Sequence, residues 1–113
     1  MLHEMKLNAE AFEKMKAGTK TVEIRLLDEK RRNLKVGDEI KFFKLPERSE
    51  TIIVKVKKLE RFASFREIFG KIDKKLFGHD GLTTERQLER IYKIYSEEDE
   101  KKLGALAIFV EPI

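Results

Sequence analysis

Lys20, Glu23 and Arg25 are the residues of this sequence whose types and spacing are best suited to chemistry. Apolar and polar residues alternate from Thr21 to Leu27, so an extended strand places Glu23 and Arg25 side by side on one face. Charged residues are depleted from strands, so this face is either a solvated surface or the wall of a cleft. Such a cleft can bind a phosphate or a nucleobase edge, because arginine presents a planar fork of donors and glutamate accepts hydrogen bonds from an exocyclic amine.

Both interpretations of this strand remain open at the level of sequence. In the first, Glu23 and Arg25 form a surface ion pair that contributes about 0–1 kcal/mol. In the second, Lys20 joins them in a cleft, which requires the strand to begin after a turn at Thr19-Lys20, as a left-handed helix cap at Gly18 allows. The charged residues that follow the strand extend the candidate binding set: Asp28, Arg31 and Arg32.

Length and composition predict one domain, residues 1–113, with enough chain to bury roughly two-thirds of its unfolded surface. The 25 basic residues exceed the 21 acidic ones, and a pI near 9.3 permits a polyanionic partner without requiring one. Cysteine is absent, which excludes disulfides, thiol nucleophiles and cysteine-ligated metals and fits a reducing, cytoplasmic compartment.

The same composition argues against several further classes. No segment approaches the ~20 apolar residues of a membrane helix, and no apolar run follows Met1, so neither a membrane span nor a signal peptide is expected. Two histidines far apart in the chain, His3 and His79, predict no metal site, and no cofactor is expected. Abundant lysine and glutamate with few side-chain amides are typical of proteins from thermophiles.

The patterns along the chain predict an α+β fold: a small, partly open mixed β-barrel with flanking helices. A helix over Ala9–Ala17 begins at Asn8 and ends at Gly18, and a second begins at the capping box Ser64–Glu67. Thr84 with Gln87 forms another capping box, followed by apolar residues at helical spacing through Tyr95. The loop Lys71–Gly81 is expected to be partly helical, and Ser96–Lys102 to be a turn or helix. The predicted strands are His3–Leu7, Thr21–Leu27, Glu39–Leu45, Thr51–Leu59 and Leu103–Val110.

The motif Gly18-x-Lys20-Thr21-x-Glu23-x-Arg25, followed by Gly37-Asp38 and a strand containing Phe42, resembles the ASCH domain family, whose fold is similar to the PUA domain. The resemblance covers nearly the whole chain and suggests a small prokaryotic single-domain member. It includes the opening His3-x-Met5-x-Leu7, the helix start Phe62-x-Ser64-Phe65 and the closing strand after Gly104. Membership implies a barrel with a cleft lined by the lysine, glutamate and arginine positions, and an RNA-related role.

Some bacterial ASCH members similar to this chain are amidohydrolases that deacetylate N(4)-acetylcytidine, using a lysine, a threonine three residues on and a downstream glutamate. Lys20 matches that lysine, Glu23 stands at the threonine position, and Asp80 lies near the expected glutamate. On this interpretation Lys20 acts as a base toward water or as a nucleophile, Glu23 shuttles a proton or orients the departing amine, and Asp80 is a second carboxylate.

The favoured prediction is a module that binds RNA, a nucleoside or a nucleotide, because unstacked bases can enter such a cleft. The amidohydrolase is the rival, and an adaptor that binds protein is a third possibility. His3 and Tyr95 are added as candidate ligand contacts. A basic run on one strand is either a solvated face or a phosphate track for RNA: Lys55, Lys57, Lys58 and Arg61.

Overall fold

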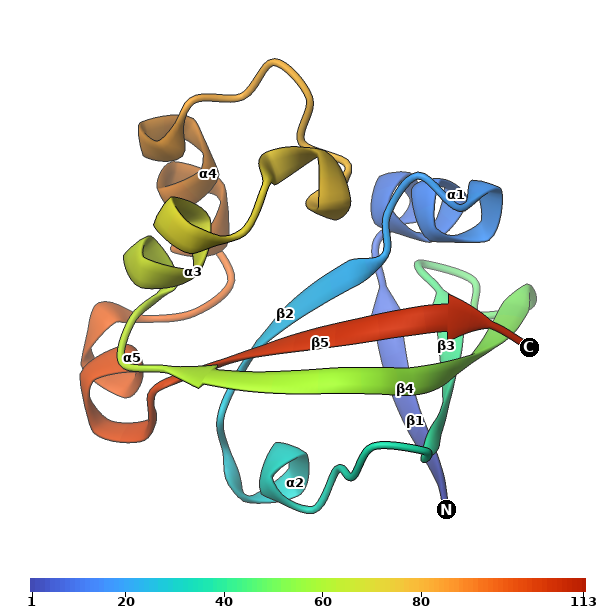
Figure 1. Ribbon diagram of the computed structural model, residues 1–113. Coiled ribbons are helices and arrows are strands. Elements are labelled where there is room, and N and C mark those ends of the chain that lie inside the picture. The colour runs from blue at the N-terminus through green and yellow to red at the C-terminus, as the bar shows by residue number, and fades with distance from the viewer.

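The computed structural model describes residues 1–113 and has the α+β architecture that the sequence predicts (Figure 1). Five strands form one curled sheet, and short helices cover its ends and one face. The strands are β1 (Leu2–Leu7), β2 (Val22–Leu26), β3 (Glu39–Lys44), β4 (Thr51–Phe62) and β5 (Ala105–Pro112). The helices are α1 (Ala9–Ala17), α2 (Glu29–Arg32), α3 (Phe65–Lys71), the 3₁₀ helix η1 (Lys74–Phe77), α4 (Thr84–Ile91) and α5 (Glu97–Leu103).

The sheet has the strand order β1-β3-β4-β5-β2, so β1 and β2 are its two edges. Strands β1 and β3 are parallel and all other pairs are antiparallel. The long β4 shifts register between Val56 and Lys58, and such a bulge bends a strand and increases its twist. The curled sheet is a half-barrel, which confirms the predicted mixed, partly open barrel.

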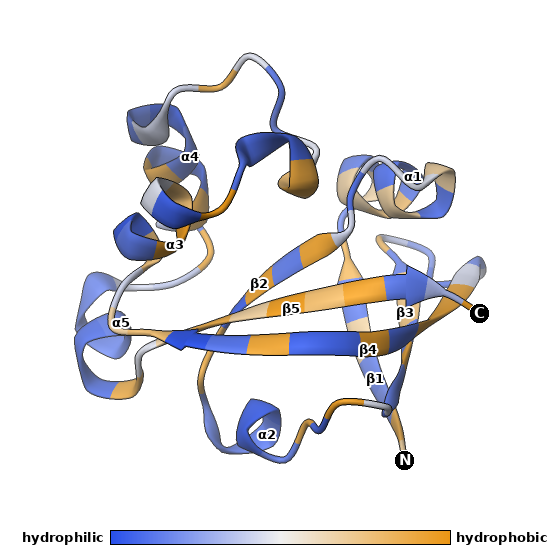
Figure 2. Ribbon diagram, in the orientation of Figure 1, coloured by the Kyte–Doolittle hydropathy of each residue, from blue (hydrophilic) through white to orange (hydrophobic).

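Two apolar clusters lie on opposite sides of β5. Leu106, Ile108 and Val110 pack into the barrel interior, whereas Ala105 and Ala107 face the cluster beneath α3 and α4. The sequence predicted a strand buried on both faces here, and this is confirmed. Figure 2 shows the contrast between the apolar centre of β5 and the alternating hydropathy of β4.

Side chains, not a backbone ladder, connect the two sheet edges. The Arg25 Nη2 of β2 donates to the Lys6 carbonyl of β1 at 2.6 Å, and Lys30 Nζ from α2 donates to the Glu4 carbonyl at 3.3 Å. These contacts satisfy edge carbonyls that a closed barrel would pair with a neighbouring strand. We call this boundary between β1 and β2 the seam. No helix of the chain is both long and apolar enough to cross a bilayer.

Most of the predicted helix starts are confirmed, and one is wrong. Asn8 and Ser64 cap α1 and α3 by accepting from backbone amides at 2.8 and 3.1 Å. Helix α4, however, is capped by Thr83 and not by Thr84, since the Thr83 hydroxyl accepts from the Arg86 amide at 3.1 Å. Two adjacent threonines offer the same chemistry, and the tertiary path of the chain selects the first.

Helix α4 also ends sooner than the apolar spacing predicts. It stops at Ile91, and Tyr95 lies in the turn that follows. The Ile94 amide donates to the Ile91 carbonyl at 3.0 Å, a three-residue bond that tightens the end of the helix. This turn brings Tyr95 back toward β2.

Candidate functional site

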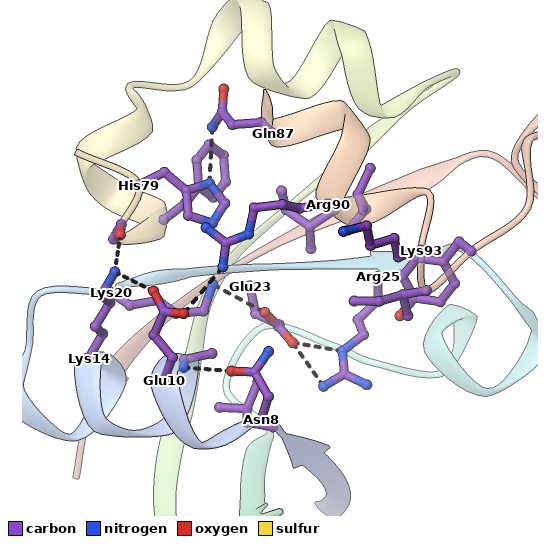
Figure 3. Close-up of a pocket in the computed structure, with 18 of the residues that line it drawn as sticks. Asn8, Glu10, Lys14, Lys20, Glu23, Arg25, His79, Gln87, Arg90 and Lys93 are labelled. Carbon is purple, nitrogen blue, oxygen red and sulfur yellow. Dashed lines mark hydrogen bonds and ion pairs between the residues drawn. The ribbon is translucent and has the colours of Figure 1, made fainter. Parts of the chain in front are cut away.

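A cleft of about 610 Å³ opens between α1, β2 and the segment from the end of η1 to Tyr95 (Figure 3). Seven lysine or arginine side chains and two glutamates line it, together with nine apolar residues. The volume falls in the range of roughly 300–1,000 Å³ that is usual for small-ligand sites. The excess of cations over carboxylates gives the cleft a positive lining, which suits a ligand that carries negative charge.

The Glu23 carboxylate occupies the floor of the cleft between Lys20 and Arg25. Its Oε1 lies 3.2 Å from Lys20 Nζ, and its Oε2 accepts from Arg25 Nε at 2.8 Å and lies 2.8 Å from Arg25 Nη2. Lys20 Nζ also donates to the Val22 carbonyl at 2.9 Å, because the chain turns before β2 and folds the lysine back. Glu23 is 8% exposed and Lys20 is 6% exposed, so the polar face of β2 is a cleft wall and not a solvated surface.

Pairing keeps the buried charges of this cluster ionised. Burial alone would raise the pKa of Glu23, but the charges and hydrogen bonds of Lys20 and Arg25 more than offset it, and the pKa is lowered. Burial alone would likewise lower the pKa of Arg25, but the Glu23 carboxylate reverses the effect and the pKa is raised. The cluster therefore holds two cations and one anion at neutral pH, a net positive charge at the cleft floor.

A second, more exposed cluster spans the mouth of the cleft. Glu10 of α1 accepts from Lys14 Nζ at 3.1 Å and from Arg90 Nη2 of α4 at 3.4 Å. Lys14 Nζ also donates to the Gly78 carbonyl at 2.7 Å. Figure 3 shows Glu10 between Lys14 and Arg90, across from the Glu23 floor. These contacts connect the two helical walls of the cleft.

His79 lines the cleft as a neutral imidazole. Its Nδ1 lies 3.0 Å from the Nε2 of the buried Gln87, and the amide donates to it when the other ring nitrogen carries the proton. Burial, followed by the positive charges of Lys20, Arg90 and Lys14, lowers the pKa of His79 to about 4. The imidazole is therefore uncharged at pH 7 and keeps one ring N–H as a donor.

The structure brings together some of the predicted site residues. Lys20, Glu23, Arg25 and Tyr95 all line the cleft. Burial, aided by the Glu23 charge and opposed by Arg25, raises the pKa of Tyr95. The Tyr95 ring is stacked on Phe65 with a centroid distance of 5.6 Å, and its hydroxyl lies within hydrogen-bonding reach of Arg25.

Asp80 does not line the cleft, so the structure does not bring it beside Lys20 and Glu23 as the second carboxylate that the sequence predicted. His79 is held inward by Gln87 and by packing near Phe77, with ring centroids 5.7 Å apart, and its neighbour Asp80 is exposed. Glu10 is the second carboxylate of the cleft instead.

His3 is also absent from the cleft. It lies near the start of β1, where its Nε2 is 2.8 Å from Asp38 Oδ2, whereas the cleft contacts the end of β1.

The charged residues of α2 lie on the far side of Arg25. Asp28 caps α2 by accepting from the Arg31 amide at 2.9 Å, and it pairs with Arg31 Nη1 at 3.0 Å. Arg31 lines a second, smaller pocket, and Arg32 is exposed and lines neither pocket.

Several cleft residues have no counterpart in the sequence-based prediction: Lys6, Glu10, Lys14, His79, Arg86, Gln87, Arg90 and Lys93. They come from one strand and from helices and turns that are far apart in the chain. Arg86 and Arg90 of α4, and Glu10 and Lys14 of α1, are each four residues apart and share a helix face, which are the local signals that the sequence offered.

The curled five-stranded sheet, its flanking helices and the cleft at the seam define a PUA-like domain. The family model of the ASCH domain matches residues 5–113, and the chain belongs to the ASCH domain family. This confirms the resemblance found in the sequence. A search of the curated proteins finds no significant match.

Solved structures support the same assignment. The hypothetical protein PH0355 is 39% identical over 100% of both chains, with a TM-score of 0.89. PF0455 from Pyrococcus furiosus is 37% identical over 100% of this chain and 98% of its own, with a TM-score of 0.80. The S128A mutant of ZmASCH from Zymomonas mobilis shares the fold at 14% identity, over 99% of this chain and 72% of its own, with a TM-score of 0.65.

Proposed function

We propose that the cleft binds one nucleotide of a single-stranded RNA, with the base toward Glu23. The observation that carries this proposal is the ionised, buried Glu23 held by Lys20 and Arg25 at the floor of a positively lined cleft. A carboxylate has about four lone-pair sites. Three contacts occupy Glu23, two of them on Oε2, so Oε1 keeps a site for an N–H donor.

Base edges and the cleft have complementary chemistry. The exocyclic amines of cytosine, adenine and guanine are donors that a carboxylate accepts. The uncharged His79 and the Tyr95 hydroxyl add hydrogen-bonding groups that face a base, while cations at the mouth attract its phosphates. Family membership supports this proposal, since an RNA-related role is what the ASCH resemblance implies.

The proposal is tested by fluorescence anisotropy with a short, labelled, single-stranded RNA of mixed sequence, measured over a range of salt concentrations. We expect binding that weakens steeply as salt rises, and a loss of affinity in Arg90→Gln at the cleft mouth. The matched control is Lys55→Gln, which removes the same charge from an exposed residue of β4. If Lys55→Gln weakens binding and Arg90→Gln does not, RNA follows the basic run of β4 and the cleft proposal fails.

An amidohydrolase acting on N(4)-acetylcytidine is the second candidate, favoured by the 3.2 Å approach of Lys20 Nζ to Glu23 inside a cleft. Two observations weigh against it. Lys20 Nζ contacts the Val22 carbonyl and the Glu23 carboxylate, which occupy two of its three N–H donors and suit a structural cation better than a base, and Asp80 lies outside the cleft. Turnover of N(4)-acetylcytidine by the wild type, absent in a folded Lys20→Met variant, would favour the enzyme over the binding module.

A further inference from the structure

A second pocket of about 380 Å³ adjoins the cleft along the seam. We call it the seam pocket, and its charged lining residues are Glu4, Lys6, Arg25, Lys30, Arg31 and Arg48. Lys6 and Arg25 line both the cleft and the seam pocket. The two hollows are therefore neighbours that share one lysine and one arginine as their common wall.

The seam pocket is strongly cationic, with five basic side chains against one acidic residue. Three of them, Lys6, Lys30 and Arg48, form no ion pair with any carboxylate of the chain. Most basic residues of the cleft, by contrast, are paired with Glu10 or Glu23. The seam pocket thus carries positive charge that the protein itself does not neutralise.

Two of the basic residues around this pocket have unusual local features. Arg31 is fixed by Asp28 through Nη1, and its buried Nε has no hydrogen-bond partner. Arg48 is the one residue other than glycine with a positive φ, at 65°, in the turn between β3 and β4. Such a conformation is unfavourable for arginine and is found mostly in turns, and here the Arg48 amide donates to the Lys44 carbonyl at 2.8 Å.

We infer that the seam pocket binds a phosphate group of the nucleotide whose base occupies the cleft. This inference rests on the proposed function, because the cleft supplies the site for the base. Arg25 connects the base site in the cleft with the phosphate site in the seam pocket. Its Nε and Nη2 contact the Glu23 carboxylate and the Lys6 carbonyl, and its Nη1 takes part in neither contact. The guanidinium can therefore contact a base site on one side and a phosphate oxygen on the other.

The consequence is a preference for phosphorylated ligands. A free nucleoside fills the cleft alone, whereas a nucleotide also engages Lys30 and Arg48. Charge-assisted hydrogen bonds of this kind predict a gain in affinity of roughly ten- to a hundredfold. The gain is expected to shrink as salt rises, because the seam pocket is open to solvent.

The test is an NMR titration of the ¹⁵N-labelled full chain with the four ribonucleosides and with their 5′- and 3′-monophosphates, at up to millimolar concentrations. Nucleosides are expected to shift amides of the cleft, such as that of His79. At least one monophosphate series is expected to bind more tightly and also to shift the Arg48 and Lys6 amides.

Arg48→Asn is the decisive variant, because asparagine tolerates the left-handed conformation and the fold is not put at risk. It should remove roughly three- to tenfold of the monophosphate affinity and leave nucleoside affinity unchanged. The matched control is Arg61→Gln, which removes the same charge from an exposed position of β4 outside both pockets and should change neither affinity.

Each remaining outcome is informative. Equal affinity for nucleosides and monophosphates, with cleft amides shifting in both, would overturn the phosphate inference and leave the proposed function standing. Equal losses of monophosphate affinity in Arg48→Asn and Arg61→Gln would show that the preference for phosphate is a general charge effect, and would also overturn the phosphate inference. No shift of cleft amides by any of these ligands would refute the base site and the inference that depends on it.

Discussion

Replacement of Glu23 by glutamine is the sharpest test of the buried cluster. The substitution keeps the size of the side chain but leaves Lys20, 6% exposed, and the largely buried Arg25 without their shared anion. Removing one partner of a buried ion pair typically costs about 3–5 kcal/mol. The glutamine oxygen still accepts one hydrogen bond, so we expect a loss of about 3 kcal/mol, a large part of the ~5–15 kcal/mol of a typical domain.

The assay is urea unfolding at neutral pH followed by circular dichroism. Glu13→Gln is the matched control, since it removes the same charge from an exposed pair with Lys44 at 2.6 Å and should cost far less than Glu23→Gln. The pKa of Glu23 is lowered in the fold, so its contribution is fully present above the ordinary value of 4.5 and is lost as the pH falls through the folded value. The difference between wild type and Glu23→Gln should therefore narrow in acid.

A double-mutant cycle separates the pair from its surroundings. Lys20→Met combined with Glu23→Gln should be less destabilising than the sum of the single changes, by about 1–2 kcal/mol. Losses in Glu23→Gln and Glu13→Gln that agree within error, or strict additivity in the cycle, would refute the account of a coupled, buried cluster.

Three further outcomes are expected. In an NMR pH titration His79 should titrate near 4, and an ordinary titration near 6.5 would contradict the buried, neutral ring. The free energy of unfolding should fall as the pH drops from 6.5 to about 4, because the unfolded chain takes up the proton first. Partial exposure of the ring reduces this loss to about 1–2 kcal/mol. Thr83→Ala should destabilise the protein by about 1 kcal/mol in thermal unfolding and Thr84→Ala by less, and the reverse order would contradict the observed cap. Arg48→Asn should leave the free energy of unfolding in urea unchanged or raise it by up to about 1 kcal/mol, and a clear loss would show that Arg48 is held by contacts and not under strain.

The sequence was sufficient to predict the strands and helices whose signals lie within one short segment. The alternation around Glu23 predicted β2, the apolar run near Ile108 predicted a doubly buried β5, and Asn8 and Gly18 bounded α1 correctly. In each case the signal is a pattern of residue types within one short segment. The capping-box spacing of Thr84 and Gln87 favoured the wrong one of two adjacent threonines, because the neighbouring Thr83 has the same capping hydroxyl.

The cleft was predictable only in part, because most of its walls are long-range contacts. Lys20 and Glu23 are close in sequence, so their convergence could be inferred from one turn and one strand. Arg90 reaches Glu10 across 80 positions of the chain, and His79 depends on a hydrogen bond from Gln87 in the next helix. Asp80 was misplaced for the same reason: the direction of a loop side chain is set by what its neighbour packs against.

The most direct test of the central claim is to locate bound RNA on the protein. A short single-stranded RNA is added to the ¹⁵N-labelled chain, and the shifts of the backbone amides are mapped. The account predicts that the largest shifts cluster at Glu23, Arg25 and His79, around the cleft floor. Shifts confined to the exposed basic run from Lys55 to Arg61, with the cleft amides unmoved, would contradict it.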